Sequence, residues 1–232
     1  MHILGINAYH ADASAAIFKD GVLIAATEEE RFRRVKHWAG FPSMAISFCL
    51  KEAGITVDGL DHIAIGRDPY AKLGKKILFL LKNPGGGWKA VGDRLQNAKK
   101  VSSLEEEFVK ISPSSDKKAI KNKIHQVEHH RSHLASAFFA SPFKEAALLS
   151  LDGSGDFSTT MTGVGAANQI TVLDSVDFPN SVGIFYSAMT QFLGFPHYGD
   201  EYKVMGLAPY GQARYLDQLR EILVFKDNGF LN

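Results

Sequence analysis

The chain has 232 residues, 45% of them hydrophobic and 22% charged, which is ordinary for a soluble globular protein. This length allows one large domain or two small ones. The 26 Lys and Arg residues nearly balance the 25 Asp and Glu residues, for a formal charge of +1, so no nucleic-acid partner is expected. The single Cys49 excludes an intramolecular disulfide and fits a reducing compartment, and its apolar surroundings favour a packed core thiol.

Nothing in the sequence predicts a targeting or membrane-spanning segment. Residues 1–7 lack the basic head and the long apolar run of a signal peptide. The apolar run at residues 77–81 is far shorter than the ~20 residues that span a bilayer. We therefore expect a cytoplasmic protein with no membrane partner.

The first part of the chain predicts a ribonuclease-H-like α/β unit. Strands are predicted at residues 2–7, 14–18 and 22–27. Asp20-Gly21 is a hairpin turn, so these strands form a meander with a polar loop, residues 7–12, at one end. The charged run 28–34 is interpreted as a solvated face. A helix is predicted next, then two more strands, at residues 43–53, 61–66 and 123–127, and this order of elements is typical of that unit.

Residues 69–122 differ from their surroundings. They are basic at first and are broken by Gly and Pro at 83–88, which predicts two helical pieces joined by a loop. We interpret them as an insertion, and a basic helical insertion is most often a solvated face.

The meander pattern recurs after residue 145. Strands are predicted at residues 146–151, 158–164 and 169–173. A helix should follow, with Asn180 or Ser181 as its N-cap and Gly194 at its end, and then another at 215–225. We therefore assign residues 1–145 to a first ribonuclease-H-like half and 146–232 to the beginning of a second, incomplete half. Two meanders with polar loops suggest a duplicated fold that holds a nucleotide or phosphate between its halves.

A histidine cluster opens the helix predicted after the fifth strand. His129 and His133 are i and i+4, so their imidazoles lie on one face and can share a metal ion. Asp152, at the end of an apolar strand, is a plausible third ligand. Two nitrogens and one oxygen suit zinc or ferrous iron. Such a pair also occurs by chance, and His130 is interpreted as exposed or as supporting the site from behind.

A glycine-rich segment, residues 152–156, follows the strand that ends at Asp152. Gly153 and Gly155 allow close approach of a ligand, and the amides of this segment can point at phosphate oxygens. A tight hairpin turn is the alternative. Lys203 lies beside a glycine-containing turn and could pair with a phosphate or carboxylate, although an exposed structural lysine is equally compatible.

Several of these stretches together resemble the O-carbamoyltransferases of the nodulation and antibiotic-tailoring type (NodU, CmcH and TobZ). They are residues 3–7 with His10 and Asp12, then 26–32, 129–133, 151–156 and 201–208. The resemblance implies an actin-like (ASKHA) ATPase fold similar to that of the tRNA threonylcarbamoyladenosine synthase ATPase, followed by a YrdC-like partner domain that this sequence lacks. It further implies that carbamoyl-adenylate, made from carbamoyl phosphate and ATP, donates its carbamoyl group to a hydroxyl of a small-molecule or sugar acceptor.

The resemblance also assigns roles to residues. His129, His133 and Asp152 would hold Fe(II), or zinc or manganese, with a further Asp supplied from a later part of the domain. His10 would be the general base and Lys36 would stabilise the carbamoyl oxyanion, with ordinary loop hydrogen bonding as the alternative for both. A nucleotide-binding set would position ATP or carbamoyl-adenylate: Asp12, Gly153, Ser154, Gly155, Asp156 and Lys203.

The chain resembles only the N-terminal part of such an enzyme, which leaves the activity of the isolated chain open. Two other functions remain compatible with the residues. One is a threonylcarbamoyl-transfer or hydrogenase-maturation relative, because these share the H-x-x-x-H motif. The other is a non-catalytic fragment that binds a nucleotide or a metal.

Overall fold

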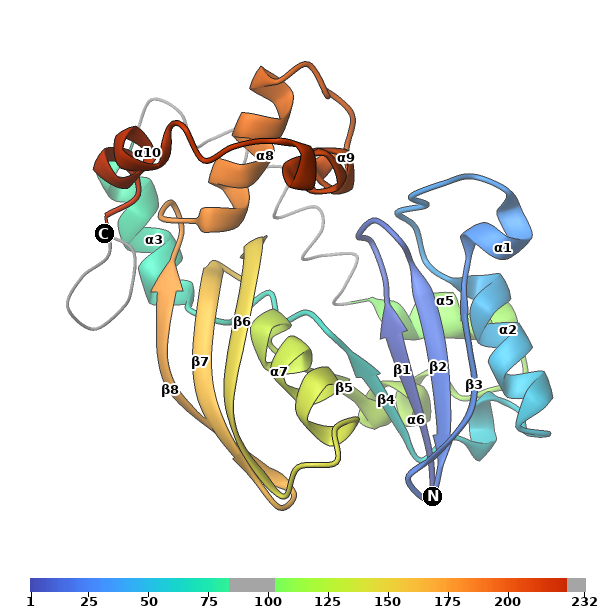
Figure 1. Ribbon diagram of the computed structural model, residues 1–232. Helices are drawn as coiled ribbons and strands as arrows, with labels where there is room; N and C mark the ends of the chain where they lie inside the picture. The colour runs from blue at the N-terminus through green and yellow to red at the C-terminus, as the bar shows by residue number, and fades with distance from the viewer. Residues whose placement is uncertain (84–102, 225–232) are drawn as a thin grey trace. The chain divides into compact units, whose positions relative to one another are not determined.

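The computed structural model describes residues 1–83 and 103–224 (Figure 1). The chain packs into two compact units, residues 1–128 and 129–232, each with its own sheet. Within the described ranges, no helix combines the length and the apolar character that crossing a membrane requires.

The first unit contains a five-stranded sheet in the order β3-β2-β1-β4-β5. Its strands are β1 His2–Asn7, β2 Ser14–Lys19, β3 Val22–Glu28, β4 His62–Ile65 and β5 Ile124–Gln126. The first three pair antiparallel, while β4 pairs parallel to both β1 and β5. Asp20 and Gly21 both have positive φ (50° and 82°), as a tight hairpin turn requires. The predicted α/β class is confirmed, and the strand order is the one expected of a ribonuclease-H-like unit.

One face of this sheet forms the core of the first unit. Alternate residues of the central strands point into it, such as Leu4 and Ile6 of β1 and Ile63 of β4. Helix α2, Ser43–Glu52, covers this face with an apolar stripe that includes Cys49, which is fully buried as predicted.

The region predicted as an insertion, residues 69–122, is only partly separate from this core. Its described helices are α3 Leu73–Lys82, α5 Leu104–Ile111 and α6 Lys117–Lys123. Leu104, Phe108 and Ile120 are buried in the same core as α2, so α5 and α6 are integral to the unit. The sequence analysis did not anticipate this packing, because burial of these three side chains depends on distant contacts. Apart from Asn83, the predicted Gly/Pro break lies outside the described residues.

The charged run 28–34 is not simply a solvated face. It contains α1, Glu30–Arg33, and the side chain of Glu29 just before it is completely buried. The Glu29 carboxylate accepts hydrogen bonds from the amides of Met44 and Ala45 at 3.0 and 2.9 Å. Nε of Arg33 donates to it at 2.7 Å. The carboxylate thus caps α2, whose N-cap position is occupied by Pro42 without a side-chain bond.

The second unit contains an antiparallel sheet in the order β6-β7-β8. Its strands are β6 Glu145–Gly155, β7 Ser158–Ala166 and β8 Gln169–Asp177. Helix α7, His129–Phe139, packs on this sheet through Leu134 and Phe138 (Figure 1). The recurrence of the meander is therefore confirmed. The predicted boundary at 145/146 differs from the packing, because the buried face of α7 groups that helix with the second sheet.

Four further elements complete the described part of the second unit. They are α8 Val182–Phe192, α9 Glu201–Leu207, the 3-10 turn η2 Ala208–Tyr210 and α10 Leu216–Ile222. Oγ of Ser181 accepts a hydrogen bond from the amide of Ile184 at 3.0 Å, which confirms it as an N-cap. Gly194 follows α8 with a φ of 93°, as a helix stop often requires.

Candidate metal centre

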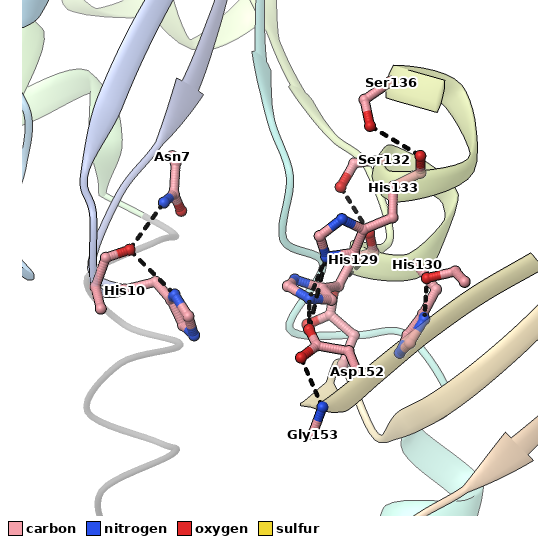
Figure 2. A network of polar contacts seen from close by, with 12 residues as sticks. Asn7, His10, His129, His130, Ser132, His133, Ser136, Asp152 and Gly153 are labelled. Carbon is pink, nitrogen blue, oxygen red and sulfur yellow. Dashed lines mark hydrogen bonds and ion pairs between the residues drawn. The ribbon is translucent and has the colours of Figure 1, made fainter. Parts of the chain in front are cut away.

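Helix α7 and strand β6 bring the three predicted metal ligands together. Nε2 of His129 lies 2.7 Å from Oδ2 of Asp152 and 3.0 Å from Nε2 of His133 (Figure 2). The same Asp152 oxygen lies 3.6 Å from Nε2 of His133. These residues form the one cluster of three or more His, Cys, Asp or Glu suited to a metal among residues 1–83 and 103–224. The predicted spatial association is present, whereas metal binding stays a prediction.

The geometry of the three atoms fits a shared ion. Metal–ligand bonds of about 2.0–2.2 Å at a tetrahedral angle place neighbouring ligand atoms about 3.3–3.6 Å apart, close to the observed 2.7–3.6 Å. One imidazole N–H donates a single proton, so one hydrogen bond joins only two of the three groups. A cation, in contrast, attracts the lone pairs of His129, His133 and Asp152 at once. The set is therefore chemically suited to zinc or ferrous iron, with further positions open to other ligands.

The histidine ring that contacts Asp152 is held by a closely packed backbone. A Cβ added to Gly155 would lie 2.0 Å from Cδ2 of His129, so the imidazole occupies the space that any larger residue needs. The backbone amide of His129 donates to Oδ2 of Asp156 at 2.9 Å. Asp156 thereby fixes the start of α7, and both ends of the glycine segment position His129.

His130 is completely buried, which excludes the first of its two interpretations, an exposed residue. Its Nδ1 lies 2.7 Å from Oγ of Ser150 on β6. This contact joins the first turn of α7 to the strand that carries Asp152. His130 therefore helps to position the helix and the strand that carry the candidate ligands.

The charge of the site is set by contacts between its own residues. Hydrogen bonds from His129, and secondarily from His133, hold the pKa of Asp152 far below its usual range. Burial opposes this shift, and the amide of Gly153, 2.6 Å from Oδ1, assists it. Asp152 is consequently a carboxylate at neutral pH and presents a negative charge to the two imidazoles.

The start of α8 supports the backbone that carries Asp152. Oγ of Ser181 lies 3.1 and 2.7 Å from the carbonyl oxygens of Asp152 and Gly153. A Cβ on Gly183 would lie 2.6 Å from backbone atoms of these same two residues. The glycine at position 183 therefore permits the close approach of helix and strand.

The glycine segment 152–156 forms part of a tight hairpin, which was the alternative to a phosphate-binding loop. Strand β6 continues to Gly155, and Gly155 pairs with Ser158 across a turn made by Asp156 and Phe157. Both turn residues have positive φ, 49° and 80°. The pairing between β6 and β7 is irregular between Leu151 and Gly155. A phosphate-binding role for Gly153, Ser154, Gly155 and Asp156 remains a prediction.

Lys203, the other predicted nucleotide contact in the second unit, forms an ion pair with the residue just before α9. Its Nζ lies 2.6 Å from Oδ1 of Asp200, a buried residue that also accepts the amide of His197 at 3.1 Å. The hydrogen bond with Asp200 raises the pKa of Lys203. Lys203 thus pairs with a carboxylate, as one of its predicted roles requires, and this carboxylate belongs to Asp200 of the same chain.

The other predicted site residues, His10, Asp12 and Lys36, belong to the first unit. Nδ1 of His10 lies 3.3 Å from the carbonyl oxygen of Ala11, to which Nδ2 of Asn7 also donates at 3.1 Å (Figure 2). Lys36 is exposed. These contacts are the local hydrogen bonds expected of a polar loop, and catalytic roles for His10 and Lys36 remain predictions.

Sequence reasoning missed the partner of Asp12. Oδ1 of Asp12 lies 3.0 Å from Nδ1 of His37, and both residues have left-handed backbone conformations, with φ of 61° and 54°. The two loops are also joined by the amide of Tyr9, which donates to the carbonyl of Gly40 at 3.1 Å. Non-glycine residues rarely adopt this conformation. No sequence pattern predicts the contact between Asp12 and His37.

Comparison with known proteins identifies the family. A family model described as "Carbamoyltransferase N-terminus" matches residues 2–230. The chain therefore belongs to the carbamoyltransferase family, as the N-terminal part of its members.

Individual relatives match the chain over nearly its whole length. The chain is 40% identical over 227 residues to an uncharacterized protein of Synechocystis, covering 96% of this chain and 37% of that protein. It is 33% identical over 226 residues to nodulation protein NolNO of Sinorhizobium fredii, covering 96% of this chain and 31% of that protein. The chain thus spans about a third of the length of these curated relatives.

Among solved structures, the chain is similar to YeaZ from Pseudomonas aeruginosa. The TM-score is 0.41 at 13% identity, covering 77% of this chain and 68% of that one.

Proposed function

We propose that this chain is the metal- and nucleotide-binding part of an O-carbamoyltransferase. In this proposal carbamoyl phosphate is hydrolysed to carbamate and phosphate, and carbamate reacts with ATP to give carbamoyl-adenylate and pyrophosphate. The carbamoyl group then passes to a hydroxyl of a sugar or other small molecule, with release of AMP. The observation that carries it is the convergence of His129, His133 and Asp152 within 4.8 Å, in a chain whose family is defined by carbamoyl transfer. A YrdC-like domain would supply the carbamoyl-adenylate.

The residues of the cluster would hold ferrous iron, or zinc or manganese in its place. Such an ion supplies Lewis acidity, which polarises a phosphate or carbamoyl oxygen. The chain contributes the arrangement: α7 fixes the two imidazoles, and the hairpin and the start of α8 fix Asp152. The structure around the cluster supports this role, because His129 and the backbone of Asp152 are each held by a contact from outside the cluster.

His10 would accept the proton of the acceptor hydroxyl, and Lys36 would stabilise the negative oxygen that develops during transfer. Asp12, the glycine segment 153–156 and Lys203 would contact the nucleotide. For Lys203 this requires exchange of its present partner Asp200. The exposure of His10 and Lys36 supports their accessibility to a substrate.

Metal analysis of the purified chain tests the first part of the proposal. The parent should contain about one Fe or Zn per chain, and His129→Ala and Asp152→Ala should contain none. His197→Ala is the matched control, because it removes an exposed histidine outside the cluster. Metal retained in both ligand variants would contradict the assignment of this site.

Carbamoyl transfer is tested separately, with labelled carbamoyl phosphate, ATP and a panel of sugar and aminoglycoside acceptors. The isolated chain should be compared with a protein as long as its curated relatives. Label in the acceptor, with AMP released in equal amount, supports an O-carbamoyltransferase. Binding of metal and ATP without transfer in the longer protein would favour the non-catalytic alternative, and transfer to threonine would favour the threonylcarbamoyl type.

A further inference from the structure

Two exposed histidines on neighbouring parallel strands of the first unit lie in contact. Nδ1 of His62 on β4 is 2.9 Å from Nε2 of His125 on β5, and the ring centroids are 4.9 Å apart. Both residues belong to the first unit, whereas the ligands His129, His133 and Asp152 all belong to the second. The pair therefore shares no residue with the candidate metal centre described above.

The strand register explains why these rings meet. Ala64 of β4 pairs with His125 of β5, and His62 precedes Ala64 by two residues, so both histidines point from the same face of the sheet. Their neighbours Ile63 and Ile124 point to the opposite, core-facing side. The backbone of two hydrogen-bonded strands thus holds the imidazoles in place, and ligand binding at this point needs little reorganisation.

We propose that His62 and His125 form a second transition-metal site, which takes a divalent ion such as Cu²⁺ or Ni²⁺. Two bonds of about 2.0–2.1 Å to one ion place their nitrogens about 2.9–3.4 Å apart, depending on whether the angle is right or tetrahedral. The 2.9 Å between the two ring nitrogens lies within that range. Among divalent first-row ions, Ni²⁺ and Cu²⁺ also bind imidazole more strongly than Fe²⁺ does.

The site differs in kind from the cluster in the second unit. It offers two nitrogens and no carboxylate, because in the described part of the chain no third His, Cys, Asp or Glu completes a set there. Water fills the remaining positions of the ion. An ion bound in this way links β4 to β5 through side chains as well as through the backbone ladder.

A simple hydrogen bond between the rings is the competing explanation, since one neutral imidazole can donate to the other at this distance. The two explanations differ in what they predict for added metal. A metal site loses an ion when either ring is removed, whereas a hydrogen-bonded pair leaves the number of bound ions unchanged.

Calorimetric titration with Ni²⁺ separates these explanations. His62→Gln and His125→Gln should each bind about one Ni²⁺ per chain less than the parent, and Ni²⁺ should raise the melting temperature of the parent more than that of either variant. His197→Gln should bind as many ions as the parent. Melting temperatures measured in EDTA check that the variants fold.

An unchanged number of Ni²⁺ ions in both variants would overturn the proposal and leave a hydrogen-bonded pair. Asp152→Ala, titrated in parallel, separates the two sites. If the cluster in the second unit takes Ni²⁺, this variant also loses one ion, and the losses with His62→Gln are additive because the sites share no residue. Failure of the His129 cluster to bind metal would not alter the result expected at His62 and His125.

Discussion

At the residue scale, Gly155 is the position on which the geometry of the metal ligands depends most directly. In Gly155→Ala the new Cβ would lie 2.0 Å from the His129 ring, so the ring has to move away from Asp152. We expect affinity for Fe(II) or Zn²⁺ to fall by roughly 10- to 100-fold, as for other residues that orient metal ligands. Calorimetric titration of the purified variant measures this change.

Gly153→Ala is the control for that experiment. Gly153 lies in the same segment, but a Cβ added there has no atom within 4 Å. We expect its metal affinity to equal that of the parent. Equal losses of metal affinity in the two variants would show that the segment needs glycine for a reason other than space for the His129 ring.

The raised pKa of Tyr9 predicts that the stability of the fold depends on pH. Burial, with a smaller contribution from Glu107, raises the pKa of Tyr9 to about 12. Since the pKa of an unfolded tyrosine is about 10, the folded chain holds this proton more tightly, and the resulting stability is complete below about pH 10 and is lost as the pH rises toward 12. Urea titrations across this window should show a shallower decline for Tyr9→Phe; an identical decline would contradict the assignment.

The candidate ligands could be found from the sequence because their spacing has a geometric meaning. An interval of four on a helix places His129 over His133, and Asp152 directly follows the apolar run 146–151. His37 could not be found, because its contact with Asp12 joins residues 25 positions apart through two loops. Such loops follow no helical or strand period that would reveal which side chains meet.

At the element scale, α2 depends on a cap supplied from outside the helix. Removal of the buried Glu29 carboxylate leaves the amides of Met44 and Ala45 and the Arg33 guanidinium without this acceptor. We expect Glu29→Ala to lower the free energy of unfolding by about 1–3 kcal/mol, as measured by urea titration.

The neighbouring Glu28 provides the matched control. Its side chain is 43% exposed, and its nearest cation is Arg31 at 3.6 Å. Glu28→Ala should change the free energy of unfolding by less than about 1 kcal/mol. A similar small effect of Glu29→Ala would mean that water replaces the cap.

Elements whose apolar pattern is local were predicted well from the sequence. Strands of the first meander, α2 and α8 begin and end close to the predicted residues, because alternation or a cap marks them. Strand β8 runs four residues past its predicted end, to Asp177. The roles of α5 and α6 were misjudged, since their charged sequence conceals the buried Phe108 and Ile120. The end of β6 was also placed too early, because a glycine segment is compatible with both a loop and a strand.

At the scale of the whole molecule, the division into two units predicts where metal binding stabilises the chain. All three ligands lie in the second unit. Anaerobic Fe(II) at about 100 times its dissociation constant should add about 2.7 kcal/mol to the stability of the unit that binds it. Hydrogen exchange measured by mass spectrometry should therefore slow in α7, β6 and β7.

The five-stranded sheet of the first unit should show no comparable change in that experiment. Asp152→Ala with the same Fe(II) concentration is the control, because it removes one ligand without touching the first unit. Equal protection of both sheets would contradict the assignment of the ion to the second unit.

The three ligands also come from one short stretch of chain, and this affects how the cluster can assemble. His129 and Asp152 are 23 residues apart, and a closed loop of this size costs less conformational entropy than a longer one. α7 and the β6–β7 hairpin are consecutive in sequence, so contacts between them rank among the faster ones to form in a folding chain. An ion can accordingly be captured during refolding before the long-range pairing of β4 with β1 is complete.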